Sequence, residues 1–282
     1  MGQRRKSKAS REDKQTASRL RLLLRGHPLR LAVVGAVAVV LVALAGTGAL
    51  LARGGAGPDT GGKTAAIVDQ LSLTQPNPEF VSSARVILAE AGYVVDYYAG
   101  EQVTVDLYRT LPERGYDLVI LRAHAGITNE VDFATGERSK TEYVSLFTGE
   151  PYNANKYPDE QLNRLGKARY YEGAAPLFGI GPDFVKYSME GTFDDTLIVM
   201  MGCDGLRSQR TAEAFLEKGA GAFVSWSQPV SAPHTDAATE RLLERLLIDG
   251  LPTKEAVSQT AEEIGPDPVY KGELRVLEAG GS

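Results

Sequence analysis

Short apolar runs alternate with amphipathic segments along most of the chain after residue 63. The runs have the length and composition of buried strands, and the segments between them carry apolar residues at helical spacing. This alternation predicts an α/β fold with a mostly parallel central sheet and right-handed crossovers. The expected strands are 64–71, 93–98, 116–123, 196–201, 222–227 and, at the sheet edge, 272–277; the expected helices are 78–91, 105–114, 211–218, 236–247 and 254–264.

Two of these strands end on residues that can carry chemistry. The run Thr196–Met201 leads through a glycine to Cys203, the only cysteine of the chain, and the run Tyr116–Ala123 leads to His124. In an open α/β sheet, the carboxyl ends of neighbouring parallel strands meet at one edge, where ligands bind. We therefore expect a thiol and an imidazole to lie at the same edge of the sheet.

The alternation stops between residues 127 and 191, where Tyr, Asn, Gly and Pro are frequent. We expect an insertion here, with hairpin arms at 131–138 and 142–147 and a short helix at 159–165. A long irregular segment beside a reactive edge is typical of a lid or a binding wall, and a surface embellishment is the alternative.

The amino-terminal part has a different character from the rest. Residues 1–30 are basic, residues 31–52 are apolar and long enough to cross a bilayer, and residues 53–63 form a Gly-rich tether before the domain at 64–282. A cleaved signal peptide is the alternative, but its apolar region runs only about 7–15 residues. Because Lys and Arg precede the span, we expect a single-pass cell-membrane protein with a cytoplasmic amino terminus and an extracytoplasmic carboxy-terminal domain.

Charge narrows the range of partners. The first thirty residues hold ten Lys and Arg against two acidic residues, so the overall net charge of −5 conceals a strongly acidic domain. Such a domain is a poor ligand for nucleic acid, and we expect none as a partner.

The surroundings of Cys203 favour a nucleophile. A thiol becomes nucleophilic when an imidazole or a helix amino terminus stabilises its thiolate, and Cys203 lies at a strand-to-helix junction among Gly202, Asp204 and Gly205. These neighbours suit a tight turn more than core packing. The alternative is a small apolar filler, because a lone free cysteine is among the most buried residue types.

The order of these motifs resembles the caspase–hemoglobinase superfamily of cysteine peptidases, in its caspase-like, CHAT and gingipain-like branches. The chain has an apolar strand ending in His124-Ala125-Gly126 and a later one ending in Gly202-Cys203-Asp204-Gly205. The strand 219–226, with its tryptophan, resembles the strand that lines the substrate groove in these proteins. The resemblance covers roughly residues 64–264 and implies a three-layer α/β sandwich.

The resemblance also implies an activity and roles for residues. The domain would hydrolyse peptide bonds of a peptide or protein substrate, without cofactor or metal, through His124 as general base and acid and Cys203 as nucleophile. Oxyanion donors would be the N–H groups of Cys203 and of Ala125 or Gly126. Substrate would be bound by Asp204, Ser225, Trp226 and Ser227. Because the domain is acidic, we expect a cationic or small residue before the cleaved bond.

The same residues allow several alternative hypotheses about function. Ala125 stands where the family has glycine, which favours a catalytically inactive caspase-like binding or scaffolding module tethered to the membrane. A cysteine phosphatase needs an arginine six residues after the cysteine, where this chain has Gln209, and a glutamine amidotransferase needs glycine at Met201. A zinc site from His124, Cys203 and His234 would lack the usual close-spaced ligand pair.

Overall fold

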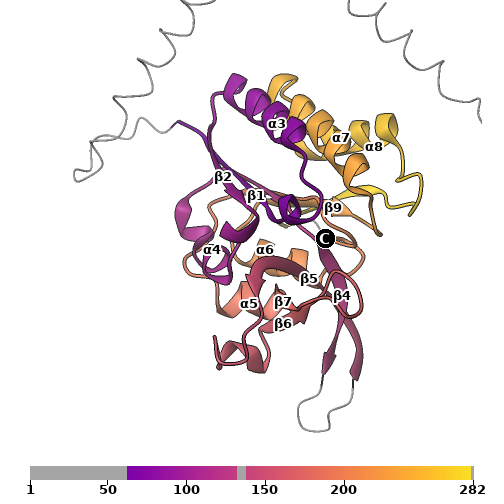
Figure 1. Ribbon diagram of the computed structural model, residues 1–282. Coiled ribbons are helices and arrows are strands. Elements are labelled where there is room, and N and C mark those ends of the chain that lie inside the picture. Colours follow the sequence, from indigo (N-terminus) through magenta and orange to yellow (C-terminus); the bar gives the residue numbers. More distant parts are fainter. Residues whose placement is uncertain (1–61, 132–137, 281–282) are drawn as a thin grey trace, which may run out of the picture. The chain divides into compact units, whose positions relative to one another are not determined.

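The computed structural model describes residues 62–131 and 138–280, which belong to one compact unit spanning Thr60–Ser282 (Figure 1). The predicted basic leader, the membrane span and most of the tether lie outside the described residues. Within these residues, no helix combines the length and apolar composition needed to cross a membrane.

A six-stranded sheet forms the centre of the domain, in the order β10-β9-β8-β3-β1-β2. All neighbouring pairs are parallel except β10 with β9, so the predicted mostly parallel sheet is confirmed. The chain passes from β1 to β2 on one side and then returns to β3 on the other. The strands are β1 Thr64–Asp69, β2 Val94–Ala99, β3 Leu118–Arg122, β8 Leu197–Met200, β9 Ala222–Trp226 and β10 Leu274–Glu278.

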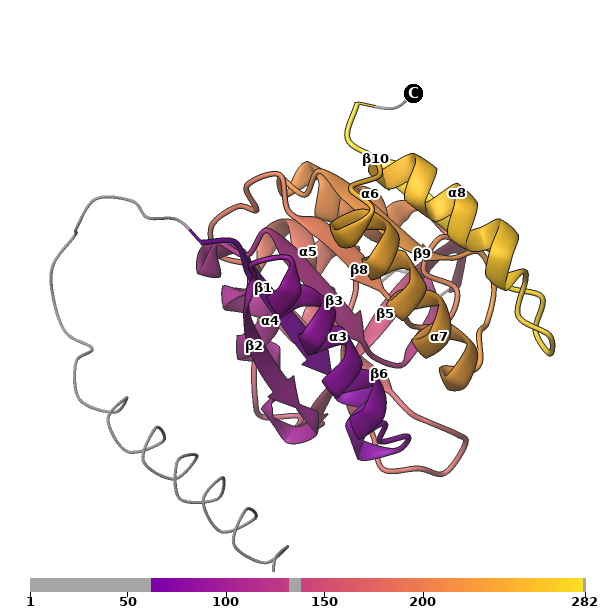
Figure 2. The ribbon, with the colours of Figure 1, turned by 90° about the horizontal axis from the view of Figure 1, so that it is seen from above.

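Helices cover both faces of this sheet, as Figures 1 and 2 show. Along β1, Ala65 and Ile67 point into one apolar core and Ala66 and Val68 into a second core on the opposite face. This period of two is the alternation expected of a strand buried on both sides. The first core is covered by α3 Pro78–Glu90, α7 Ala232–Leu243 and α8 Thr253–Ile264, and the second by α4 Val105–Thr110, α5 Pro182–Tyr187 and α6 Arg210–Glu217.

A second, antiparallel sheet occupies most of the predicted insertion, in the order β4-β5-β7-β6. This sheet adds four side chains to the second core: Val144, Leu146, Phe178 and Ile180. The region is therefore part of the packed domain, not an irregular surface loop. A hairpin is present, but its arms are Ala125–Val131 and Arg138–Pro151. The expected second arm, 142–147, lies within β5, whereas most of the expected first arm, 131–138, lies outside the described residues. The expected helix is a single 3₁₀ turn at Glu160–Leu162. The strands are β4 Ala125–Val131, β5 Arg138–Pro151, β6 Leu165–Ala168 and β7 Leu177–Ile180.

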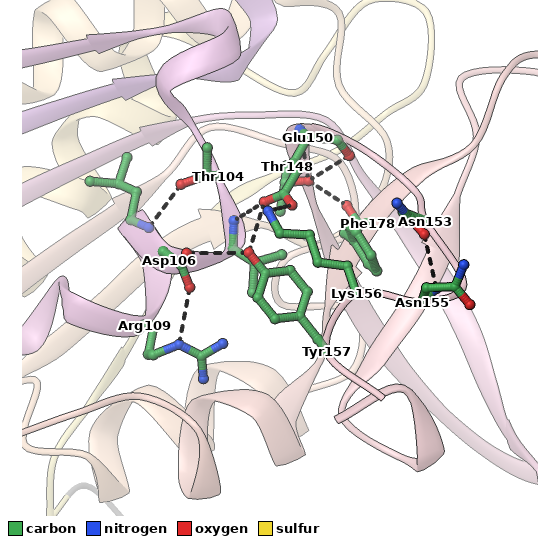
Figure 3. Close-up of polar contacts among 12 residues, drawn as sticks. Thr104, Asp106, Arg109, Thr148, Glu150, Asn153, Asn155, Lys156, Tyr157 and Phe178 are labelled. Carbon is green, nitrogen blue, oxygen red and sulfur yellow. Dashed lines mark hydrogen bonds and ion pairs between the residues drawn. The ribbon is translucent and has the colours of Figure 1, made fainter. Parts of the chain in front are cut away.

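A polar cluster holds the turn after β5 against the start of α4 (Figure 3). The Glu150 carboxylate accepts a hydrogen bond from the Val105 N–H at 3.0 Å and forms an ion pair with Lys156. The Tyr157 hydroxyl contacts Asp106 at 3.3 Å and Glu150 at 3.4 Å. Because Glu150 is buried, these partners compensate the cost of removing its charge from water.

Candidate active site at the ends of β3 and β8

His124 and Cys203 follow neighbouring strands at the same level of the sheet. The parallel register pairs Leu118 with Leu197 and runs on to Leu121 with Met200. Continued at the same spacing, this register brings His124 level with Cys203. The predicted meeting of the two side chains at the carboxyl edge therefore follows from the strand pairing itself.

The backbones that lead to the two side chains are in close contact. A Cβ atom placed on Gly202 would lie 2.3 Å from the carbonyl oxygen of Ala123, a distance that real Cβ atoms do not show. Only glycine permits this approach. Gly202 therefore allows the segments just before Cys203 and His124 to lie against each other.

Both side chains line one cavity of ≈ 360 Å³ at this edge. One wall comes from the loop after β9, at residues 229–233, and another from the segment after β1, where Leu71 and Gln75 lie. The full lining is Leu71, Gln75, Ala123, His124, Met201, Gly202, Cys203, Pro229, Val230, Ser231, Ala232, Pro233, Thr235 and Tyr270.

The His124 ring is half-buried among three side chains. Its Nε2 atom lies 2.9 Å from the Thr74 hydroxyl, and its ring centre lies 4.9 Å from that of Tyr170 and 6.0 Å from that of Phe147. Burial, together with the positive charge of Arg122, lowers the pKa of the His124 imidazole below its usual value. His124 is therefore neutral near pH 7 and able to accept a proton.

Gln70 fixes the backbone next to this ring. Its side-chain oxygen accepts the His124 N–H at 3.0 Å, and its amide nitrogen donates to the Tyr170 hydroxyl at 2.7 Å. Gln70 is fully buried, so both polar ends depend on these bonds. Gln70, Thr74 and Tyr170 were not expected at the site, because no sequence motif marks them.

The Cys203 thiol is half-buried and protonated in its ground state. Its Sγ atom lies 3.6 Å from the carbonyl oxygen of Val230 and donates to it. Burial raises the pKa of the thiol, and the negative charges of Asp204 and Asp267 act in the same direction; the backbone of Val230 acts in the opposite direction but does not reverse the shift. This environment thus favours the protonated thiol over the thiolate that a nearby imidazole would stabilise.

The backbone N–H groups near the two side chains differ in where they point. The Phe147 N–H donates to the His124 carbonyl, which makes Ala125 and Leu146 a non-hydrogen-bonded pair of the β4–β5 ladder. The Ala125 N–H consequently points away from β5, and the Gly126 N–H points toward it. No backbone carbonyl among the described residues accepts the Cys203 N–H. Of the expected oxyanion donors, Ala125 and Cys203 therefore have N–H groups that the β4–β5 ladder does not use.

Asp204 lies beside the cavity without lining it. Its backbone is left-handed, with φ 61°, and its N–H donates to the Gln228 carbonyl at 3.2 Å. The carboxylate is buried and 3.7 Å from Arg207. Burial raises its pKa, and the nearby Glu142 adds to the shift, although Arg207 opposes it. Asp204 shapes the turn after the cysteine.

Ser225, Trp226 and Ser227 are also absent from the cavity lining, and all three are buried. The Ser225 hydroxyl donates to the Met200 carbonyl at 2.7 Å, and the Trp226 indole donates to Thr235 at 2.9 Å. The Ser227 hydroxyl accepts the Glu273 N–H at 3.1 Å. These residues join β9 to its neighbours, and the segment that follows them, 229–233, forms the wall instead.

A buried ion network underlies the site. Arg122, two residues before His124, contacts Asp69 at 2.8 Å and Asp236 at 2.8 and 2.9 Å, and donates to the Gln75 carbonyl at 3.0 Å. All three charged side chains are buried. The network ties the ends of β1 and β3 to α7. An arginine ending an apolar strand was the signal available in the sequence, since buried arginines need partners.

Asp267 orders the opposite wall. It accepts hydrogen bonds from the Ser231 N–H and hydroxyl at 2.9 and 2.7 Å, and from the N–H groups of Val269 and Tyr270 at 2.9 and 2.7 Å. Burial alone raises its pKa, but these bonds outweigh burial and lower it to about 2. The carboxylate thus fixes Ser231 and Tyr270, which line the cavity.

Comparison with models of known protein families gives no match to the chain, and comparison with curated proteins gives none either. Within residues 62–131 and 138–280, no group of three or more His, Cys, Asp or Glu side chains is placed to hold a metal ion. His234, the third residue considered for a zinc site, packs against Trp226 and contacts the Gly265 carbonyl at 3.1 Å. The geometry at the cavity is that of a thiol and a neutral imidazole.

Proposed function

We propose that the domain is a caspase-like cysteine peptidase that hydrolyses peptide bonds through Cys203 and His124. The observation that carries this proposal is the position of the two residues just after the neighbouring strands β3 and β8, where both line one cavity. The resemblance in motif order supports the same class.

The environment favours a neutral dyad over a preformed ion pair. His124 would take the thiol proton as Sγ attacks the substrate carbonyl carbon, which forms a C–S bond and moves the carbonyl electrons onto oxygen. The N–H groups of Cys203 and Ala125 would donate to that oxygen. His124 would then return the proton to the leaving amine, and a water deprotonated by His124 would cleave the thioester.

The segment that holds His124 suits this role. Nε2 contacts Thr74, so Nδ1 is the ring nitrogen left for the thiol. Gln70 holds the His124 backbone through its N–H, and the ring of Tyr170 packs against the imidazole. A base held in one orientation spends less free energy on alignment during the reaction.

The second candidate is an inactive caspase-like module that binds partner proteins. The observation that favours it is the raised pKa of the Cys203 thiol, together with the thiol's contact to the Val230 carbonyl. In this alternative Cys203 is a cavity-wall residue. In both, we place the domain outside the cell membrane, held by the predicted span at 31–52, which lies outside the described residues.

Cleavage of an unfolded protein separates the two candidates. The full chain, Cys203→Ser and His124→Gln would each be incubated with reduced, carboxymethylated casein, and new termini counted by mass spectrometry. The peptidase requires new termini with the wild-type chain and a loss of at least about 100-fold with either variant. Equal cleavage by all three, or none by any, would reject it.

A further inference from the structure

We infer that the cavity beside Cys203 receives an uncharged aliphatic side chain, such as that of Leu or Met, from the residue whose carbonyl is attacked. This inference rests on the proposed function, because it assigns the cavity to the acyl side of the cleaved bond. A cavity with the nucleophile in its wall is adjacent to the carbonyl under attack, so the side chain of that residue is the group able to enter it.

The lining provides no partner for a charge. None of the residues that line the cavity is Asp, Glu, Lys or Arg, and its ionisable groups are His124, Cys203 and Tyr270. The remaining surface is largely apolar, with Leu71, Met201 and Val230 among its members. An ammonium, guanidinium or carboxylate entering here would lose its water without gaining an opposite charge, which is strongly unfavourable.

The charged groups nearest to the cavity are already paired. Arg122 lies between Asp69 and Asp236 and is fully buried. Asp267 has both oxygens occupied by hydrogen bonds from the backbone and from Ser231, which lies at the amino end of α7. That end of the helix is therefore already matched by a carboxylate and offers little attraction to an incoming anion.

Asp204 does not change this result. Its carboxylate is buried, lies 3.7 Å from Arg207 and is absent from the lining. A substrate cation in the cavity would feel the field of Asp204 and Asp267 but could contact neither. The net charge of the domain led to the expectation of a cationic residue before the cleaved bond. The uncharged lining of the cavity favours an aliphatic residue there instead.

The cavity has room for one aliphatic side chain. At ≈ 360 Å³, it is near the lower end of the range of about 300–1,000 Å³ seen for ligand pockets, and it is larger than a Leu or Met side chain. Tyr270 is half exposed and Gln75 is exposed, whereas Leu71 and Met201 are buried. An apolar side chain in the cavity would contact Leu71 and Met201 while its backbone lies near Gln75 and Tyr270.

Gln75 offers an isosteric test of the charge argument. Its backbone carbonyl accepts from Arg122, while its exposed side chain is free to change without breaking that bond. Gln75→Glu adds one carboxylate to the lining with almost no change in shape, and Gln75→Lys adds one cation. The wild-type Gln75 is the matched neutral control.

The experiment uses fluorescein-labelled tripeptides that end in Leu, Lys or Asp, each as a carboxamide and as an aldehyde, with the full chain. Binding of the carboxamides is measured by fluorescence anisotropy. Native mass spectrometry, without any reductant, follows the reversible adducts of the aldehydes, in which Sγ bonds to the aldehyde carbon and the thiol proton passes to the aldehyde oxygen. We expect the Leu carboxamide to bind at least roughly tenfold more tightly than the Lys and Asp carboxamides.

Gln75→Glu should reduce the difference in affinity between the Leu and Lys carboxamides and leave that between Leu and Asp unchanged. Gln75→Lys should reduce the difference between the Leu and Asp carboxamides and leave that between Leu and Lys unchanged. Tighter binding of Lys or Asp to the wild-type chain, equal binding of all three, or binding of none would overturn the inference. If the chain binds the Leu carboxamide selectively but forms no aldehyde adduct on Cys203, the peptidase is rejected, and the cavity remains a binding site for an aliphatic side chain with no bond to cleave. Adducts on Cys203 that form equally with all three aldehydes would support the peptidase and overturn the inference about the cavity.

Discussion

His124 and Cys203 follow adjacent strands, and the residue offset that pairs Leu118 with Leu197 is also the offset between the imidazole and the thiol. The parallel pairing of β3 with β8 brings the two strand ends together, and the turns that begin after Arg122 and Met200 carry the two side chains. A change that shifts the register or separates the strand ends should therefore act on both residues at once.

Gly202→Ala should separate the strand ends. Its Cβ would lie 2.3 Å from the Ala123 carbonyl oxygen, and overpacking of this kind costs about 1–3 kcal/mol of unfolding free energy. Urea denaturation measures the loss. Gly166→Ala, in β6, is the control, because its Cβ would meet no atom within 4 Å. Equal stability of the two variants would show that the close approach has no energetic consequence.

Iodoacetamide labelling across pH tests the neutral dyad. Because burial raises the pKa of the Cys203 thiol, the labelling midpoint should lie above the value of about 8.5 found for free cysteine. His124→Gln should leave the midpoint in place, since a neutral imidazole adds no charge to stabilise a thiolate. A midpoint well below 8.5 that rises in His124→Gln would instead indicate a preformed ion pair.

Arg122→Met should be the most destabilising of these substitutions. It leaves the buried carboxylates of Asp69 and Asp236 without their cation, and breaking a buried pair in this way costs about 3–5 kcal/mol. Arg275→Met removes an exposed partner of Glu273 and should cost less than about 1 kcal/mol. Thermal or urea unfolding compares the two, and similar losses would contradict the assigned role of the network.

Asp267→Asn should change how the free energy of unfolding depends on pH. The folded pKa of about 2 lies below the usual value, so the carboxylate stabilises the fold above about pH 4, and this contribution is lost as pH falls through 2. The shift corresponds to about 2 kcal/mol. The variant should lose that amount at neutral pH and less as pH falls. If the unfolding free energies of the wild-type chain and the variant differed by the same amount at every pH, the assigned role of Asp267 would be contradicted. Asp249→Asn, at an exposed position, is the control substitution.

Much of the central sheet could be predicted from the sequence, because parallel strands buried on both faces are continuous apolar runs. The strand expected at 222–227 is β9, Ala222–Trp226, and the helix expected at 78–91 is α3, Pro78–Glu90. That helix carries clear signals: the Asn77 side chain caps it by accepting the Phe80 N–H, and Gly92, with φ 83°, follows it. The level placement of the two site residues followed from the same logic.

The second sheet could not be predicted in this way. Strands β6 and β7 are four residues long and include Gly166 and Gly179, so neither shows a pattern that a loop would lack. Gly179 is required by contact, since a Cβ there would lie 2.6 Å from the Ser145 hydroxyl. Tyr170 reaches His124 only because this sheet brings its loop there.

Substrate contacts were harder still, because they depend on which side of a strand faces the cavity. Trp226 lies on a strand beside the site, yet its ring points into the core and bonds to Thr235. The two acidic partners of Arg122 come from residues more than fifty positions away, one in each direction. Such pairings are properties of the folded sheet and leave no local pattern in the sequence.

Capture of an acyl-enzyme tests the central claim most directly. The full chain would be mixed with a peptide thioester ending in Leu, quenched in acid within seconds, and its mass and modified residue determined. The account predicts one acyl group on Cys203 in the wild-type chain, none in Cys203→Ser at that site, and acylation at least about 100-fold slower in His124→Gln. Acylation at another residue, or acylation of Cys203 that is equally fast without His124, would contradict it.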